Sequence, residues 1–204
     1  MTPVALVTED ELSEAVAVRL LAEHPALAES PPMLLRKNGF GYLRSRMDSW
    51  RQMANRQIVV VLTDLDRLAC PLLLLEDWLG ADRQHPENLL LRIAEREVES
   101  WLLADHEALG KLLGSKVRYP AQPDTLPDPK QHLLELAQKA PRAVREDLIA
   151  QQGVVARQGI GYNRRLVDWI QAEWSPERAA ARSSSLCRAR NAMRAAALRA
   201  LPAK

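Results

Sequence analysis

The sequence predicts an α/β protein in which a parallel sheet of about four strands is flanked by helices and followed by a helical C-terminal extension. Apolar runs that suit strands alternate with helical patterns over the first hundred residues, as in a chain that winds around a parallel sheet. The run IVVVL at residues 58–62 is apolar without alternation and rich in Val and Ile, which is typical of a strand buried on both faces. The segments after residue 129 show helical patterns alone, which predicts the extension.

Composition places the chain among ordinary soluble globular proteins, with 47% apolar and 26% charged residues. Its 204 residues are enough for one domain, or for one domain with an appendage. No apolar run approaches the roughly 20 residues of a membrane helix, and the N-terminus has no basic segment typical of a signal peptide. Cys70 and Cys187 lie far apart without a CxxC partner, which argues against a zinc site and a disulfide framework. We therefore expect a protein of the reducing cytoplasm with no membrane contact.

The predicted core occupies residues 1–113. Strands are expected at residues 3–7, at 33–36, from 58 to an acidic turn at 64–66, and at 88–93. Helices are expected from Glu11 or Ser13 to about residue 21, at 42–55 after a Gly-Phe-Gly turn, and from Pro71 to Gly80. Pro71 suits the first turn of its helix and Gly80 suits the end, because proline fits the first helical position and glycine accepts the conformation that follows the last.

Residues 94–113 are expected to form a helix, since Ala94, Val98, Trp101 and later leucines fall on one apolar stripe. Asp105 falls inside that stripe, where an unpaired carboxylate is costly. Two interpretations remain open for it. Either Asp105 binds something, or the helix breaks there and Asp105 caps a second helix.

Residues 114–204 are expected to form a proline-containing linker and an Arg-rich helical extension that packs on the core. Prolines at 120, 123, 127 and 129 forbid a regular helix in the linker. Helices are then expected at 130–140, at 142–149, at 163–174, from Pro176, and at about 183–201, with a glycine-containing loop at 152–162.

Three acidic side chains mark the candidate site. Glu9 comes first after the first strand, and Asp64 and Asp66 follow the buried strand. Side chains two residues apart in extended chain point the same way, so both aspartates should project from the carboxyl edge of the sheet, where open α/β sheets bind ligands. Like charges held together are most easily kept ionised by a cation, and Mg²⁺ suits carboxylate ligands. The alternative is that these acids only begin turns and cap helices.

The charge is unevenly divided along the chain. Residues 1–140 contain 16 Lys and Arg against 21 Asp and Glu, whereas residues 141–204 contain 12 against 5. An acidic site beside a basic segment suits a metal centre that acts on a polyanion. The basic helices could equally be solvated, or face an acidic partner protein.

Six segments resemble the small stand-alone Toprim-like proteins of bacterial mobile and defence loci. These segments, in chain order, are VTEDELSEAV, VVVLTDLD, EVESWLLAD, DPK, GIGYN and SSSLCRAR. The resemblance implies that Glu9, Asp64 and Asp66 bind Mg²⁺ for strand breakage, joining or nucleotidyl transfer. It also implies a signature at Glu99, Trp101 and Asp105, and a partner ATPase of the ABC type. Asp10 departs from the glycine that Toprim chains usually place after the first glutamate.

Together with this resemblance, these observations predict a Mg²⁺- or Mn²⁺-dependent nuclease in anti-phage defence, with DNA as the expected substrate and RNA as the second choice. Glu9, Asp64 and Asp66 are the expected metal ligands, and Glu99 or Asp105 is expected to complete the site or to hold a second metal. The side chains expected to contact the phosphate are those of Lys130 and of Arg157 or Arg188. Nucleic acid is the expected partner, with a homodimer as one option. The alternative is a non-catalytic interaction subunit or effector controlled by a partner ATPase, and a third interpretation is a primase-like nucleotidyl transferase.

Overall fold

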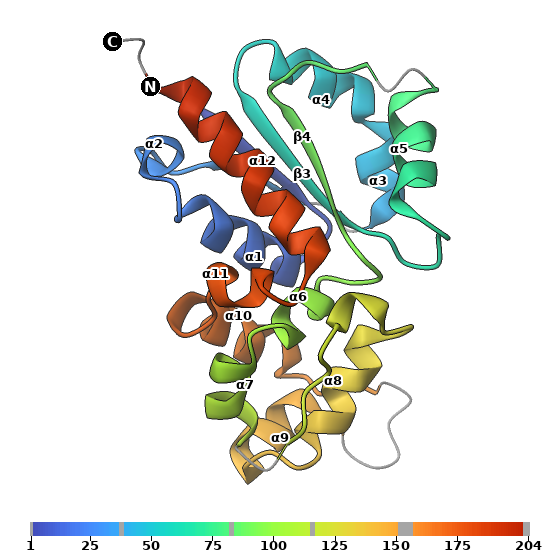
Figure 1. Ribbon diagram of the computed structural model, residues 1–204, viewed down its shortest axis with the longest axis vertical. Coiled ribbons are helices and arrows are strands. Elements are labelled where there is room, and N and C mark those ends of the chain that lie inside the picture. Colours follow the sequence, from blue (N-terminus) through green and yellow to red (C-terminus); the bar gives the residue numbers. More distant parts are fainter. Residues whose placement is uncertain (1, 37–38, 82–83, 115–116, 151–156, 202–204) are drawn as a thin grey trace.

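The computed structural model describes residues 2–36, 39–81, 84–114, 117–150 and 157–201. It confirms the α/β class, with an all-parallel sheet of four strands flanked by helices (Figure 1). The strands are β1 (Val4–Thr8), β2 (Met33–Arg36), β3 (Ile58–Asp64) and β4 (Leu89–Ala94). Their order across the sheet is β2-β1-β3-β4, so the chain moves first to one side of β1 and then to the other.

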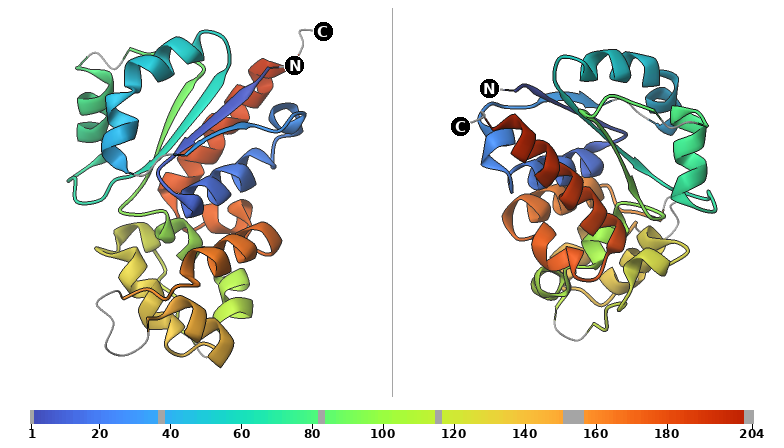
Figure 2. Two further views of the ribbon diagram at one scale, coloured as in Figure 1. Left: turned by 180° about the vertical axis from the view of Figure 1, so that it is seen from behind. Right: turned by 45° about the horizontal axis from the view of Figure 1, so that its top comes forward.

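The sheet is covered on both faces, as the unbroken apolar run in β3 predicted. Ile58, Val60 and Leu62 face a layer that includes α1 (Glu11–Leu21) and α12 (Ser184–Ala200). Val59 and Val61 face the opposite layer. That second layer consists of α3 (Phe40–Ser45), α4 (Met47–Ala54) and α5 (Pro71–Leu79). The view from behind in Figure 2 shows these helices separated from α1 and α12 by the sheet.

Local sequence signals explain several helix boundaries. The side chain of Asp10 accepts a hydrogen bond from the Ser13 amide and caps α1. Pro71 begins α5, and Gly80 ends it at a positive φ of 87°. Both predicted ends of that helix are therefore confirmed.

The predicted helix at 42–55 is wrong as a single element. It consists of α3 and α4, which meet at Arg46 with a φ of −106°. The carbonyl of Leu43 accepts from the Arg46 amide and from the Trp50 indole instead of continuing the helical ladder. The expected turn at 39–41 is also shorter than predicted, because α3 already begins at Phe40.

The predicted helix at 94–113 is likewise divided. β4 extends to Ala94, Arg96 has a φ of 65°, and the helical part splits into α6 (Glu99–Leu103) and α7 (His106–Leu113). Asp105 lies between them and caps α7 by accepting from the Ala108 amide. Of the two interpretations of Asp105, the structure favours the break with a capped second helix.

The C-terminal segment is helical, as expected. Its helices are α8 (Pro129–Ala137), α9 (Arg142–Leu148), α10 (Tyr162–Ala172), α11 (Pro176–Ala180) and α12. Short helices that the sequence analysis did not predict are α2 (Pro25–Ala28) and a 3₁₀ turn at Pro123–Thr125. Residues 151–156 of the predicted glycine-containing loop lie outside the described residues.

One buried apolar cluster joins the N-terminal and C-terminal parts of the chain. Leu186 and Met193 of α12 belong to the same cluster as Val4 and Leu6 of β1. Figure 1 shows α12 lying along the sheet and α1, while α7, α8 and α9 extend beyond the carboxyl ends of the strands. No helix within the described ranges has the length and apolar character needed to span a bilayer.

Candidate functional site

The candidate site lies where the strand order reverses. The first crossover leads from β1 to β2 on one side, and β3 lies on the other side of β1. The connections therefore diverge at the carboxyl ends of β1 and β3, and open α/β sheets bind ligands in the crevice at such a point. Glu9 directly follows β1, and Asp64 is the last residue of β3.

Strand register brings Glu9 and Asp64 together. Thr8 pairs with Leu62, so Glu9 lies beside the last two residues of β3. The Glu9 carboxylate accepts a hydrogen bond from the Thr63 hydroxyl at 2.5 Å and one from the Asp64 amide at 3.3 Å. The Asp64 carboxylate in turn accepts from the Val98 amide at 2.9 Å. Two acids separated by more than fifty positions in sequence are thus held at one edge of the sheet.

The backbone conformation at Asp66 differs from the prediction. The strand ends at Asp64, and Asp66 adopts a left-handed conformation with a φ of 49°. Its amide donates to the carbonyl of Arg96, and the Arg96 guanidinium donates to the carbonyl of Asp66, both at 2.8 Å. Arg96 also has a positive φ, so two strained turns support each other. The prediction of an extended Asp64–Asp66 pair is wrong, but the negative charge of Asp66 acts on both Glu9 and Asp64.

Two further acids approach from the end of β4. Glu99 is only 4% exposed; its carboxylate accepts from the Tyr162 hydroxyl at 2.9 Å and lies 4.0 Å from the Lys130 ammonium. Glu97 accepts from the Lys130 amide at 2.9 Å. The sequence analysis named Glu99 and overlooked Glu97. The position of Glu97 just after a predicted parallel strand was the signal that could have found it.

Burial and mutual repulsion raise the pKa values of these acids. Loss of hydration raises the pKa of Asp64 well above its usual value, and the charges of Glu99 and Glu9 add to the effect. Burial also raises the pKa of Glu9 and of Glu97. The pKa of Glu99 rises to about 7 through burial, although the neighbouring Lys130 charge opposes the shift. A cation among these carboxylates would therefore stabilise their charged forms.

The donor set suits Mg²⁺ or Mn²⁺ chemically, since carboxylate oxygens are the ligands that these hard cations take. In the part of the chain that the structure describes, no group of three or more Asp, Glu, His or Cys side chains already has the arrangement to hold a metal ion. The carboxylates of Glu9 and Asp64 accept backbone hydrogen bonds, whereas the Asp66 side chain is exposed. Completion of a three-carboxylate site therefore depends on Asp66.

Two of the three predicted phosphate contacts lie beside the acids. Lys130 and Arg157 line one groove together with Glu97. The Lys130 ammonium lies 5.2 Å from the centre of the Tyr162 ring, and the Arg157 guanidinium donates to the Gln131 side chain at 3.0 Å. A phosphate close to the carboxylates could therefore find cationic donors on this side.

Arg188 and Asp105, which the sequence analysis assigned to the site, each have an ion-pair partner of their own. Arg188 forms an ion pair with Glu95 and lines a separate groove beside Cys187. Asp105 is fully buried and accepts from both ends of the Arg178 guanidinium at 2.9 and 2.8 Å, and from the Ser175 amide at 2.8 Å. These contacts hold the start of α7 against α11, which is a structural role.

Fold and site together define an α/β protein with a carboxylate cluster at the switch point of a four-stranded parallel sheet. Comparison of the chain with protein-family models, with curated proteins and with solved structures found no match.

Proposed function

We propose that the protein is a Mg²⁺- or Mn²⁺-dependent nuclease that hydrolyses phosphodiester bonds, with DNA as the first substrate to test. The observation that supports this most strongly is the convergence of Glu9 and Asp64 at the switch point of the sheet. Lys130 adds a cation 4.0 Å from Glu99 of the same cluster. Membership of the Toprim-like proteins, a role in anti-phage defence and control by a partner ATPase are parts of the proposal that rest on the sequence resemblance.

The residues have separable roles in this proposal. Glu9, Asp64 and Asp66 hold the metal, and a bound divalent ion supplies activation of a water molecule and neutralises charge on the phosphodiester. Lys130 and Arg157 bind phosphate oxygens through charge-assisted hydrogen bonds. Because the pKa of Glu99 is about 7, its carboxyl group can hold or release a proton near neutral pH. Tyr162 fixes the orientation of that carboxyl group.

The test compares the wild type with Asp64→Asn and with Asp48→Asn. Asp48 is a matched control, since its side chain is 90% exposed on α4 and pairs only with Arg51 of the same helix in the described structure. We expect Mg²⁺ or Mn²⁺ to raise the melting temperature of the wild type and of Asp48→Asn, because a ligand that binds only the folded state stabilises it. Asp64→Asn should lose this response.

Cleavage of plasmid, single-stranded DNA and RNA is then measured with the same three proteins. We expect Mg²⁺-dependent cleavage that falls by about a hundredfold or more in Asp64→Asn, the scale of removing one electrostatic stabiliser, and is unchanged in Asp48→Asn. Equal cleavage by wild type and Asp64→Asn, or no cleavage of any of these substrates by the wild type, would contradict the proposal.

A further inference from the structure

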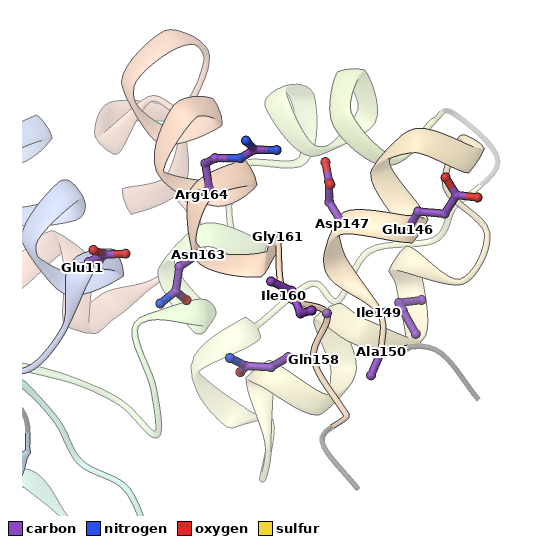
Figure 3. Close-up of a pocket in the computed structure, with 11 residues that line it drawn as sticks. Glu11, Glu146, Asp147, Ile149, Ala150, Gln158, Ile160, Gly161, Asn163 and Arg164 are labelled. Carbon is purple, nitrogen blue, oxygen red and sulfur yellow. The ribbon is translucent and has the colours of Figure 1, made fainter. Parts of the chain in front are cut away.

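A groove of about 890 Å³ has no role in the function proposed above. It runs from Glu11, two positions beyond Glu9, to the end of α9 (Figure 3). Gly161 and Asn163 line it, and the residue between them, Tyr162, donates its hydroxyl hydrogen bond to Glu99. One segment of the chain, residues 161–163, therefore lines the groove with two of its residues and reaches Glu99 of the acidic site with the third.

Ile160 stands near the middle of the lining residues in Figure 3 and is fully exposed, at 109% of its reference area. The chain around it is fixed. The Gly159 amide donates to the carbonyl of Leu148 at 2.9 Å, and the Tyr162 amide donates to the carbonyl of Gly159 at 3.1 Å. The structure thus presents a branched apolar side chain to solvent on a hydrogen-bonded segment.

The two glycines that flank Ile160 are required by close packing against α9. A Cβ atom on Gly159 would lie 2.3 Å from the backbone oxygen of Asp147, and one on Gly161 would lie 2.8 Å from its carboxylate. Asp147 is itself held by an ion pair with Arg165. The sequence Gly-Ile-Gly therefore sets the position of Ile160 rather than giving freedom to it.

Among the described residues that line the groove, the charged side chain left without an ion pair is cationic. The three acids of the groove are already paired, Glu11 with Arg36, Glu146 with Arg142, and Asp147 with Arg165. Arg164, by contrast, is exposed on the rim and has no ion-pair partner among the described residues. An anionic ligand would find this guanidinium free.

Two amides complete the lining. The side chains of Gln158 and Asn163 lie on the same side of Ile160 in Figure 3, and within the described ranges neither has a hydrogen-bond partner. An apolar surface, two amides and a free guanidinium are the groups that recognise a nucleobase and its phosphate. A branched apolar side chain can pack against the face of a base, amides can hydrogen-bond to its edge, and arginine binds phosphate.

We propose that this groove binds one unpaired nucleotide of the substrate strand, next to the phosphodiester bond that is cleaved. Ile160 contacts the face of the base, Gln158 and Asn163 contact its edge, and Arg164 binds a phosphate. This inference rests on the proposed nuclease function and narrows its substrate to single-stranded nucleic acid, because a paired and stacked base does not expose its face.

The test measures binding of two fluorescein-labelled strands of twelve units, oligo(dT) and an abasic strand with the same number of phosphates. Full-length Asp64→Asn protein in EDTA is the parent, so that the strands stay intact. We expect the parent to bind oligo(dT) more tightly than the abasic strand. Ile160→Ala should reduce this preference by about fivefold or more, since the change removes three apolar carbons that would be buried against the base. Leu198→Ala, a change at another exposed apolar side chain, should leave it unaltered.

Arg164→Gln should weaken binding of both strands to a similar degree and reduce the slope of affinity against salt by about one phosphate contact. The inference is overturned if Ile160→Ala keeps the base preference of the parent, if the parent has no such preference, or if duplex DNA binds more tightly than oligo(dT). If the wild type cleaves with Mg²⁺ but Ile160→Ala leaves the base preference unchanged, the groove proposal alone is wrong. Base-dependent binding without Mg²⁺-dependent cleavage overturns the nuclease function and supports the groove.

Discussion

At the scale of single residues, Glu99 is a buried acid that lies next to other charged groups. Its carboxylate is 4% exposed and its pKa is about 7, compared with 4.5 for an ordinary glutamate. Between these two pH values the folded chain binds more protons at this position than the unfolded chain does. The contribution of neutral Glu99 to the free energy of unfolding is therefore fully present below pH 4.5. It is lost as the pH rises toward 7.

Glu99→Gln removes this ionisation and keeps an acceptor for the Tyr162 hydroxyl. In EDTA we expect the variant to match the wild type near pH 4.5 and to be more stable at pH 8 by about 3 kcal/mol, from the difference between the two pKa values. Urea unfolding at a series of pH values measures this. Glu146→Gln is the control, because Glu146 is exposed and paired with Arg142. If the free energies of unfolding of Glu99→Gln and the wild type change with pH in the same way, ionisation of Glu99 costs little folding free energy and the prediction is wrong.

At the scale of elements, the turns that follow the strands decide the shape of the site. Backbone amides of the turn after β3 donate to carbonyls at the end of β4 and in the turn after it. The Arg96 side chain donates back to the carbonyls of Asp66 and Leu68 and so binds the two turns together. The loop that leads into α10 is held in the same manner against α9. These segments are irregular in secondary structure and are fixed by their hydrogen bonds.

Two glycine substitutions test this rigidity. Gly159→Ala should destabilise the protein by about 1–3 kcal/mol, because the new methyl group meets the backbone oxygen of Asp147 at 2.3 Å. Gly110→Ala, in the interior of α7 with open space around the new methyl group, should stabilise it by about 0.5–1 kcal/mol. Denaturant midpoints of both variants measure the two effects. A neutral Gly159→Ala would mean that the loop shifts easily and that Ile160 is not held in place.

At the scale of the whole molecule, the acidic and basic parts of the sequence neutralise each other within the chain. Arginines of α12 pair with glutamates from the first hundred residues. The pairs are Arg188 with Glu95, Arg190 with Glu23, and Arg199 with Glu87. The uneven charge along the sequence therefore reflects, in these three pairs, contact between the C-terminal helix and the core. The uneven charge is therefore weaker evidence for binding of an external polyanion than the sequence alone indicated.

The same packing predicts one cooperative unfolding transition for the chain. Met193 of α12 is 1% exposed in the cluster shared with β1, so Met193→Ala should cost about 2–5 kcal/mol. Leu198→Ala, at a side chain that is 65% exposed on the same helix, should change stability by less than about 0.5 kcal/mol. Far-ultraviolet circular dichroism and tryptophan fluorescence should report the same urea midpoint for each protein. Separate midpoints would show that the segment after residue 113 unfolds on its own.

The acidic site was predicted in part. Glu9 and Asp64 were predictable because parallel strands end at a common edge, so the first acid after each buried strand arrives at that edge. The conformation of Asp66 was not, since its left-handed turn depends on hydrogen bonds to Arg96, thirty positions later. The environment of Glu99 also escaped prediction, because Lys130 and Tyr162 come from α8 and α10.

The sequence by itself determined the alternation of strands and helices, the burial of β3 on both faces, and the placement of acids at the ends of strands. These features follow from local periodicity and from residues adjacent in the chain. Tertiary structure alone decided the ion pairing of Asp105 with Arg178, the covering of the sheet by α12, and the groove around Ile160. Each of these depends on contacts between residues distant in sequence, and side-chain periodicity carries no information about which distant partner will fill a given position.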